Sequence, residues 1–304
     1  MSFSSDVKEE LAKQYSKSRH CQIAELAAIV AMEGQIRLKP LALEFQSENP
    51  VLIAKYAILM RKVFDVDITK ELTPADSMRV LQTLKISDDL QLFKHAHDVV
   101  SLRGIRMNGL LVQKTCCRRA FIRGAFLAAG SISNPNKSYH FEIVCHSEEQ
   151  AKQLQNLMES FEADAKIVLR KNHYVVYIKD GSQIVDMLNV MEAYVSLMNL
   201  ENVRIIKEMR NTVNRKVNCE TANISKTVNA AVRQIQAIEY IRDTVGLDNL
   251  PDNLREMALL RLEYPESPLK DLGNYLEPPV GKSGVNHRLR KLTAMAEDLG
   301  LELE

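Results

Sequence analysis

The sequence predicts an α+β fold in which a duplicated α-β-β-α-β-β-α domain precedes an all-α domain with a helix-turn-helix. Two segments of small residues, 26–34 and 122–130, each end in a glycine, and these glycines lie 96 residues apart. Helix and strand signals follow both segments in the same order. A period this long indicates a duplicated domain rather than a solenoid. Beyond Asn202 the strand signals end and only helical patterns follow.

Length and composition exclude several classes of protein. The chain has 304 residues, of which 46% are apolar and 26% charged, as expected for two or three globular domains. It has no apolar run of about 20 residues and no signal-peptide layout, so we expect a cytoplasmic protein. The five cysteines are an odd number without paired CxxC motifs, and His95 and His97 face different sides of a helix. We therefore expect reduced thiols, no metal and no cofactor.

The basic residues are unevenly distributed although the net charge is only +1. No Asp or Glu occurs between Val99 and Phe141, and that stretch contains seven basic residues: Arg103, Arg106, Lys114, Arg118, Arg119, Arg123 and Lys137. One interpretation is a positive field that attracts phosphate, with Arg118 and Arg119 as additional contacts to DNA or a partner. The other is a solvated face balanced by acids elsewhere in the fold.

The first part of the chain predicts a helical arm, residues 1–19, and a first repeat, about 20–100. In the arm, Ser4 or Ser5 can cap a helix over Asp6–Leu11 and place acids in its first turn. The repeat is expected to contain a helix near 20–33, an extended pair across 35–47, a helix over 50–64, strands over 66–72 and 78–86 around the turn 73–76, and a helix capped by Ser87.

The second repeat, about 118–192, predicts the same order of elements and completes a domain over 20–200. Its expected elements are a helix over 118–130, a turn at 134–136, a strand over 139–145, a helix over 148–161, a hairpin of 165–170 and 174–179 across 171–173, and a helix over 182–191.

This order, with its paired small-residue helices, resembles the LAGLIDADG homing-endonuclease fold. The resemblance implies two motif helices packed at the centre of a pseudo-dimer, each with an acid before its terminal glycine. Small residues that permit close approach are Ala24, Ala27, Ala28 and Ala31 on one helix and Gly124, Ala125 and Ala128 on the other. The two acid positions hold Glu33 and Ala129. Because a methyl group cannot ligate a divalent ion, we predict no catalytic residues and a Glu33 that is hydrogen-bonded locally or solvated.

Residues 201–226 form a basic connector rich in Asn and Arg. Its candidate contact residues are Arg210, Asn211, Arg215, Asn218, Asn223 and Lys226. Asn and Arg side chains can form bidentate hydrogen bonds with bases or phosphates, which favours a surface that faces DNA or a partner. The alternative is an interdomain linker whose Asn residues form turns and caps.

Residues 227–304 predict a helical domain with a helix-turn-helix at about 268–299. The expected helices are about 226–245, 252–263, 268–276 and, after a two-proline break, 284–299 with Ser283 as its cap. In a helix-turn-helix the start of the second helix enters the major groove, where Asn and Arg read bases while Lys and Ser hold phosphates. The predicted DNA-binding residues are Lys282, Ser283, Asn286, His287, Arg288, Arg290 and Lys291. The alternative for this segment is a small helical docking module.

The LAGLIDADG-like pair, the connector motifs within 210–227 and the segment 283–292 together resemble the WhiA family of bacterial regulators over essentially the full chain. The resemblance implies a transcription factor that acts in cell division, chromosome segregation and, in some Gram-positive bacteria, sporulation. Family members bind promoter DNA without cutting it, and their helix-turn-helix resembles the promoter-reading region of sigma factors. The implied partners are double-stranded promoter DNA and a co-regulator or sigma factor, with no membrane and no small-molecule substrate.

We therefore predict a non-enzymatic, sequence-specific DNA-binding transcriptional regulator that is cytoplasmic and nucleoid-associated. Two alternatives stay open. One is a scaffold that recruits the division machinery and binds DNA weakly. The other is a metal-dependent endonuclease with a displaced acid.

Overall fold

The computed structural model describes residues 2–70, 72–86 and 98–301. The helix that the sequence predicts after Ser87, with His95 and His97, lies outside these residues. The chain divides into two compact units, Met1–Glu208 and Met209–Glu304. Within the described part of the chain, no helix has both the length and the apolar character needed to cross a membrane.

The first unit begins with helix α1 (Phe3–Ala12), which packs Val7 and Leu11 into the core. Its cap is Ser2, whose hydroxyl accepts a hydrogen bond from the Ser5 N–H at 3.1 Å. The sequence-based choice of Ser4 or Ser5 is therefore wrong. The extended backbone of Ser2 places its side chain within reach of the third residue of the helix, as a cap requires.

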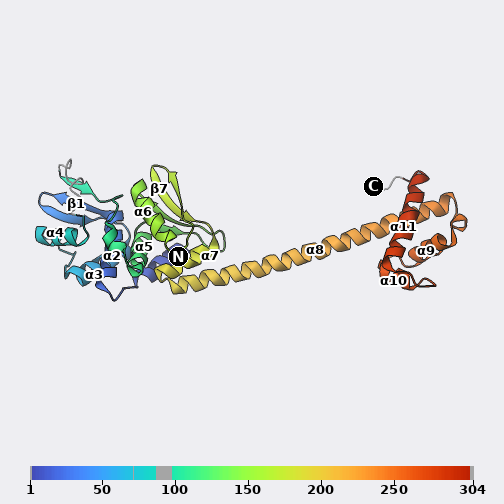
Figure 1. Cartoon of the computed structure of the whole chain (residues 1–304), viewed down its shortest axis with the longest axis horizontal. Helices are drawn as coiled ribbons and strands as arrows, with labels where there is room; N and C mark the ends of the chain where they lie inside the picture. Colours follow the sequence, from blue (N-terminus) through green and yellow to red (C-terminus); the bar gives the residue numbers. More distant parts are fainter. Residues whose placement is uncertain (1, 71, 87–97, 302–304) are drawn as a thin grey trace. The chain divides into compact units, whose positions relative to one another are not determined.

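The centre of the first unit is a pair of closely packed helices, α2 (Arg19–Glu33) and α5 (Thr115–Ala129) (Figure 1). Small residues make this approach possible. A Cβ added to Gly124 would lie 2.5 Å from the backbone oxygen of Glu25 and 3.1 Å from the Cβ of Ala28. The prediction of two side-by-side motif helices is confirmed.

Each motif helix ends at a glycine that also begins a strand. In the first sheet, β1 (Gly34–Leu38) pairs antiparallel with β2 (Leu41–Phe45) and β3 (Val99–Ser101) in the order β2-β1-β3. The second sheet has the order β4-β5-β7-β6, and all its pairs are antiparallel. Its strands are β4 (Gly130–Ile132), β5 (Phe141–Cys145), β6 (Lys166–Arg170) and β7 (His173–Ile178).

Helices pack against these sheets and against the central pair. They are α3 (Pro50–Phe64), α4 (Pro74–Thr83), α6 (Glu148–Glu159) and α7 (Gly181–Met191), with the short 3-10 helix η1 (Gly109–Val112) before α5. The second repeat therefore has the predicted order α-β-β-α-β-β-α, and the predicted hairpin at 171–173 turns through Lys171 and Asn172, both with positive φ.

The first repeat differs from its prediction at residues 66–86, where two strands were expected. Helix α4 occupies 74–83, and residues 66–70 form no strand. The Thr73 hydroxyl accepts a hydrogen bond from the Asp76 N–H at 3.1 Å, and Pro74 follows at the first helical position. Buried positions then recur with the helical period at Ser77, Val80, Leu81 and Leu84. A capped amphipathic helix therefore replaces the strand pair.

Helix α8 (Tyr194–Thr244) contains the whole predicted connector, 201–226. The interpretation in which its Asn residues form turns and caps is wrong, because these residues lie inside a continuous helix. Residues 208–230 are all exposed, so this part of α8 offers its side chains to solvent.

The second unit buries a small core that Ile238, Ile241, Met257, Leu272 and Leu289 help to form. Its further elements are η2 (Leu247–Asn249), α9 (Asp252–Glu263), α10 (Leu269–Asn274) and α11 (Lys282–Asp298). Helix α10 is shorter than predicted. Helix α11 begins two residues early, with Gly281 rather than Ser283 at its N-cap, and no side chain caps it.

Candidate nucleic-acid interface

The ends of the motif helices do not resemble a two-metal centre. Glu33 ends α2 and accepts a hydrogen bond from the Arg103 guanidinium at 2.8 Å, whereas α5 ends in Ala129. A cavity of about 760 Å³ at this place is also lined by Lys8 and Glu48. Burial raises the pKa of Glu33, against the opposing effects of Arg103 and Lys8. Two cations therefore lie where a divalent clamp would need oxygen ligands from both helices.

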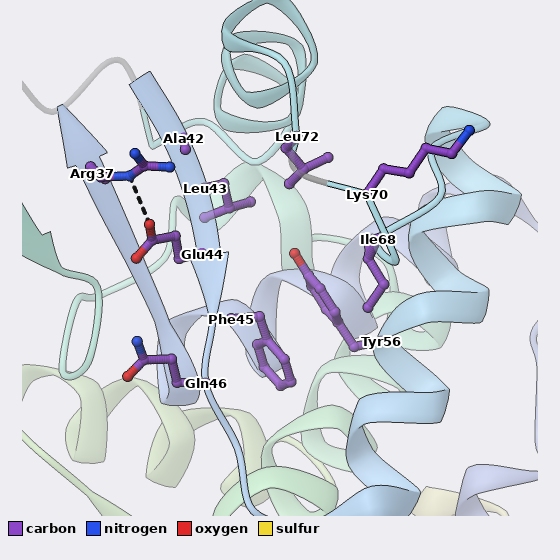
Figure 2. A pocket seen from close by; sticks show the side chains of 10 residues that line it. All are labelled: Arg37, Ala42, Leu43, Glu44, Phe45, Gln46, Tyr56, Ile68, Lys70 and Leu72. Atoms are coloured by element: carbon purple, nitrogen blue, oxygen red, sulfur yellow. Dashed lines mark hydrogen bonds and ion pairs between the residues drawn. The ribbon is translucent and has the colours of Figure 1, made fainter. Parts of the chain in front are cut away.

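A second pocket lies between the first sheet and α3 and has a volume of about 410 Å³ (Figure 2). Its rim carries Glu44, whose two oxygens accept hydrogen bonds from Arg37 and Gln35, each at 2.8 Å. Its floor is aromatic, because Phe45 and Tyr56 stack with ring centroids 4.2 Å apart. Among the described residues that line this pocket, the one acid, Glu44, is already paired with Arg37 and is not a free carboxylate for acid–base chemistry.

The acid-free stretch 99–141 does not form one positive surface. Arg103 is paired with Glu33, and the Arg118 Nε donates to the Val112 carbonyl at 3.1 Å. Arg119 lies over the Phe161 ring, 5.9 Å from its centroid. Arg106, Lys114 and Lys137 are exposed. For Arg123 the positive-field interpretation is wrong, because its side chain is only 1% exposed.

Arg123 belongs to a buried charge network that sequence reasoning did not find. Its Nε and Nη2 donate to the two Glu25 oxygens at 3.1 Å each, and its Nη1 donates to Glu192 at 2.6 Å. The Lys55 ammonium lies 3.0 Å from Glu25 and donates to the backbone oxygens of Leu11 and Gln14. The network joins α2, α3 and α5 through the buried carboxylate of Glu25. The sequence offers one signal of this network: Glu25 is the only acid in the largely apolar run 21–32.

The six candidate residues of the connector are all exposed on α8, but they do not share one face. An α-helix turns by about 100° per residue. On that basis four of them fall within about 80° of one another: Asn211, Arg215, Asn218 and Lys226. Arg210 and Asn223 point to either side. The opposite face carries five apolar residues, each 52–65% exposed: Met209, Val213, Val217, Ile224 and Val228. Glu220 and Thr227 lie among them on that face.

Helix α11 is oriented by Val285, Leu289 and Leu292, which are buried against α9 and α10. With that face fixed inward, the helical period turns four of the predicted residues outward: Ser283, His287, Arg290 and Lys291. Lys282 is exposed at the first position, and Asn286 is half-buried on the flank.

Arg288 is the exception among the predicted residues. Its Nη1 donates to the Asn253 carbonyl at 3.4 Å and lies 3.9 Å from a Glu256 oxygen, so it faces α9. Its guanidinium therefore contacts α9 in this structure, and its role in DNA binding stays a prediction.

These features define a class of protein: a LAGLIDADG-like domain whose paired helix ends have lost one acid, followed by a helical domain with a helix-turn-helix. The family model described as the WhiA LAGLIDADG-like domain matches residues 118–210, and the model of the WhiA C-terminal HTH domain matches residues 213–296.

Whole-chain relatives agree with these matches. A probable cell division protein WhiA of Lachnoclostridium phytofermentans is 50% identical over 311 residues, covering 98% of this chain and 99% of the relative. Its counterpart in Alkaliphilus oremlandii is 49% identical and covers 98% of each chain. The crystal structure of full-length DUF199/WhiA from Thermatoga maritima is 26% identical, with a TM-score of 0.57 over 99% of this chain and 100% of that chain. The chain belongs to the WhiA family.

Proposed function

We propose that the chain is a non-enzymatic, sequence-specific DNA-binding regulator of transcription in which α11 reads the major groove of promoter DNA. The observation that supports this most directly is the outward face of α11. It presents Ser283, His287 and Arg290 opposite a fully buried core stripe, with Lys282 and Lys291 at its borders. Side chains that donate to base edges lie between side chains that neutralise phosphates, as the docking geometry of a helix-turn-helix requires.

The polar face of α8 supplies a second contact to DNA or to a co-regulator in this proposal. Asn211, Arg215 and Asn218 lie on that face in the same unit as α11. The name of the relatives, probable cell division protein, supports target genes that act in cell division. The proposal extends these targets to chromosome segregation and, in a sporulating organism, to sporulation, with a nucleoid-associated location.

The experiment has two stages, because the operator must be found before specificity can be measured. Genome-wide crosslinking of the chain to DNA identifies the sites, and fluorescence anisotropy then measures the affinity for one site and for a scrambled duplex. Arg290→Ala should weaken specific binding by about 1–3 kcal/mol, about 5- to 150-fold, and leave the scrambled duplex less affected. Arg255→Ala is the matched control, since Arg255 lies on α9 and pairs with Asp252. Equal affinities of the Arg290 variant and the control for the operator would refute the assignment of α11.

Phosphate contacts have a different signature. Lys282→Ala and Lys291→Ala should each lower the slope of log affinity against log salt by about one and weaken both duplexes alike. A variant that changes specificity and leaves the salt slope unchanged would show that the lysine contacts bases instead.

The absence of catalysis belongs to the proposal and rests on the pairing of Glu33 with Arg103. The competing activity is a metal-dependent endonuclease, for which Glu48 in the same cavity is the candidate displaced acid. Supercoiled plasmid incubated with Mg²⁺ or Mn²⁺ should stay intact. If the wild-type chain nicks the plasmid and both Glu33→Gln and Glu48→Gln do not, the chain is a metal-dependent endonuclease.

The scaffold alternative is favoured by one observation, the exposed apolar face of α8 around Val213, Val217 and Ile224. Exposed apolar surface of this kind marks protein interaction sites. A stable protein partner captured by the wild-type chain and lost in Val217→Asp, together with equal affinity for operator and scrambled DNA, would favour the scaffold.

A further inference from the structure

Four side chains that bind metals meet at the N-terminal ends of the two motif helices. His20 and Cys21 lie in the first turn of α2, and Cys116 and Cys117 lie in the first turn of α5. One ligand atom from each residue, a ring nitrogen or a sulfur, lies within 4.8 Å of the other three. The His20 Nδ1 is 3.2 Å from the Cys117 Sγ and 3.3 Å from the Cys21 Sγ.

The duplication explains how the four residues come together. His20 and Cys116 are 96 residues apart, as are Cys21 and Cys117, and this is also the separation of the terminal glycines, Gly34 and Gly130. The two pairs therefore occupy equivalent positions in the two repeats. Because α2 and α5 pack side by side, equivalent positions of the two helices meet at their shared interface. A search for closely spaced CxxC motifs cannot detect such a site, and the sequence-based expectation of isolated structural thiols did not foresee it.

The donor set and its spacing fit zinc. A tetrahedral Cys₃His site has Zn–S bonds of about 2.3 Å and Zn–N bonds of about 2.0–2.1 Å, which place neighbouring ligand atoms about 3.5–3.8 Å apart. The observed upper limit of 4.8 Å is within reach of small side-chain rotations. Soft thiolate ligands with one imidazole select zinc over magnesium or calcium, which prefer oxygen.

The surroundings also fit a cation held by thiolates. Three thiolates and a neutral imidazole would leave a net charge of about −1 around Zn²⁺. The positive ends of two helix dipoles and the adjacent Lys114 offset that charge. Cys21 and Cys117 are buried over Ala24 and Ala120, whereas His20 and Cys116 are exposed. The cluster thus has an apolar floor and an open side through which a metal can enter.

We propose that His20, Cys21, Cys116 and Cys117 form a structural zinc site that links the N-terminal ends of the two motif helices. Four protein ligands complete a tetrahedral shell and leave no open position, which is the arrangement of structural rather than catalytic zinc. The site lies at the end of the helix pair opposite Glu33 and Ala129. It would stabilise the central pair at the end away from the acid positions, and it does not depend on the proposed DNA-binding function.

The test uses the full-length chain, purified under reducing conditions and stripped of metal with a chelator. Zn²⁺ is titrated in competition with a chromophoric chelator, and Co²⁺ is added separately as a spectroscopic probe. The wild-type chain should bind one Zn²⁺ per chain. With Co²⁺ it should show the thiolate-to-metal charge transfer and d–d absorption of a tetrahedral site, and its unfolding temperature should rise when either metal is present.

Two variants remove exposed ligands that contribute no core packing, Cys116→Ser and His20→Ala. Loss of a residue that hydrogen-bonds a zinc ligand typically weakens metal binding by about 10–100-fold. Loss of a ligand itself should weaken zinc binding by at least this factor. Circular dichroism confirms that each variant is folded. Cys219→Ser is the matched control, because Cys219 is exposed on α8 outside the cluster, and it should bind zinc as the wild type does.

Three results would overturn the proposal. The first is a reduced wild-type chain that binds no Zn²⁺ at micromolar free metal. The second is wild-type affinity and an unchanged cobalt spectrum in both Cys116→Ser and His20→Ala. The third is a disulfide between Cys21 and Cys117, in place of bound zinc, in the chain isolated from its own cells.

Discussion

Replacement of Glu25 by Gln tests whether the buried charge network holds the two motif helices together. The substitution keeps the shape of the side chain and removes its charge. Glu25 is fully buried, and it faces Arg123 at 3.1 Å and Lys55 at 3.0 Å, both of which are at most 1% exposed. The variant therefore leaves two buried cations, and among the described residues Glu192 is the one remaining acid paired with either of them, through Arg123.

The expected loss of stability is large because removing one partner of a buried ion pair leaves the charge of the other uncompensated. Breaking such a pair costs about 3–5 kcal/mol, which is a substantial part of the about 5–15 kcal/mol that stabilises a typical protein. Glu33→Gln makes the same chemical change at a side chain that is 20% exposed and pairs with a 44% exposed Arg103. That variant should change the free energy of unfolding by no more than about 1 kcal/mol.

Urea unfolding followed by near-ultraviolet circular dichroism of the tyrosines gives the free energy of unfolding. Hydrogen exchange localises the effect to α2, α3 and α5. Lys55→Met in the Glu25→Gln background should recover part of the loss, since it removes one uncompensated cation, so the two substitutions should be non-additive. A loss below about 1 kcal/mol for Glu25→Gln, equal to that of Glu33→Gln, would refute the reasoning.

Three further predictions concern the paired helices and helix α4, which forms where the sequence predicted strands. Gly124→Ala should destabilise the chain by about 1–3 kcal/mol in urea unfolding, because the new methyl group meets the Glu25 backbone; Gly109→Ala, with nothing within 4 Å, is the control. Burial raises the folded-state pKa of Glu33 above its ordinary value of 4.5. The free energy of unfolding of the wild type, relative to that of Glu33→Gln, should therefore fall as the pH rises through this folded-state pKa. A constant difference between the two proteins from pH 4 to pH 8 would contradict this. Thr73→Ala should cost about 1 kcal/mol through the lost cap of α4, and an unchanged free energy of unfolding would argue against that cap.

The second repeat was predicted almost completely because its signals are local. The Ser147 hydroxyl caps α6 through the Gln150 N–H, and the alternation of Phe141, Ile143 and Cys145 marks one buried face of β5. Each of these patterns is complete within a few residues, so no distant contact is needed to establish it. The prediction for residues 66–86 was wrong although the signal there is also local. It followed an apparent strand alternation and passed over the Thr73-Pro74 pair that caps and begins helix α4.

The candidate DNA-binding residues were predicted as a group, and the structure separates them. The helical period of Val285, Leu289 and Leu292 shows from sequence which face of α11 is apolar. It does not show that Arg288, on the border of that face, turns toward the Asn253 carbonyl of α9. A long side chain at such a border can reach either way, and the neighbouring helix decides which.

The sequence by itself determined the duplication, the small-residue helices, the missing acid at Ala129 and the family, because these depend on residue identity and spacing along the chain. Only the tertiary structure decided that Arg123 is buried against Glu25, 98 residues away, and that His20 and Cys21 meet Cys116 and Cys117. The physical reason is the close approach of α2 and α5. Packing of two helices converts a separation of nearly a hundred residues into direct contact, and the chemistry of the contacting side chains follows from which faces meet.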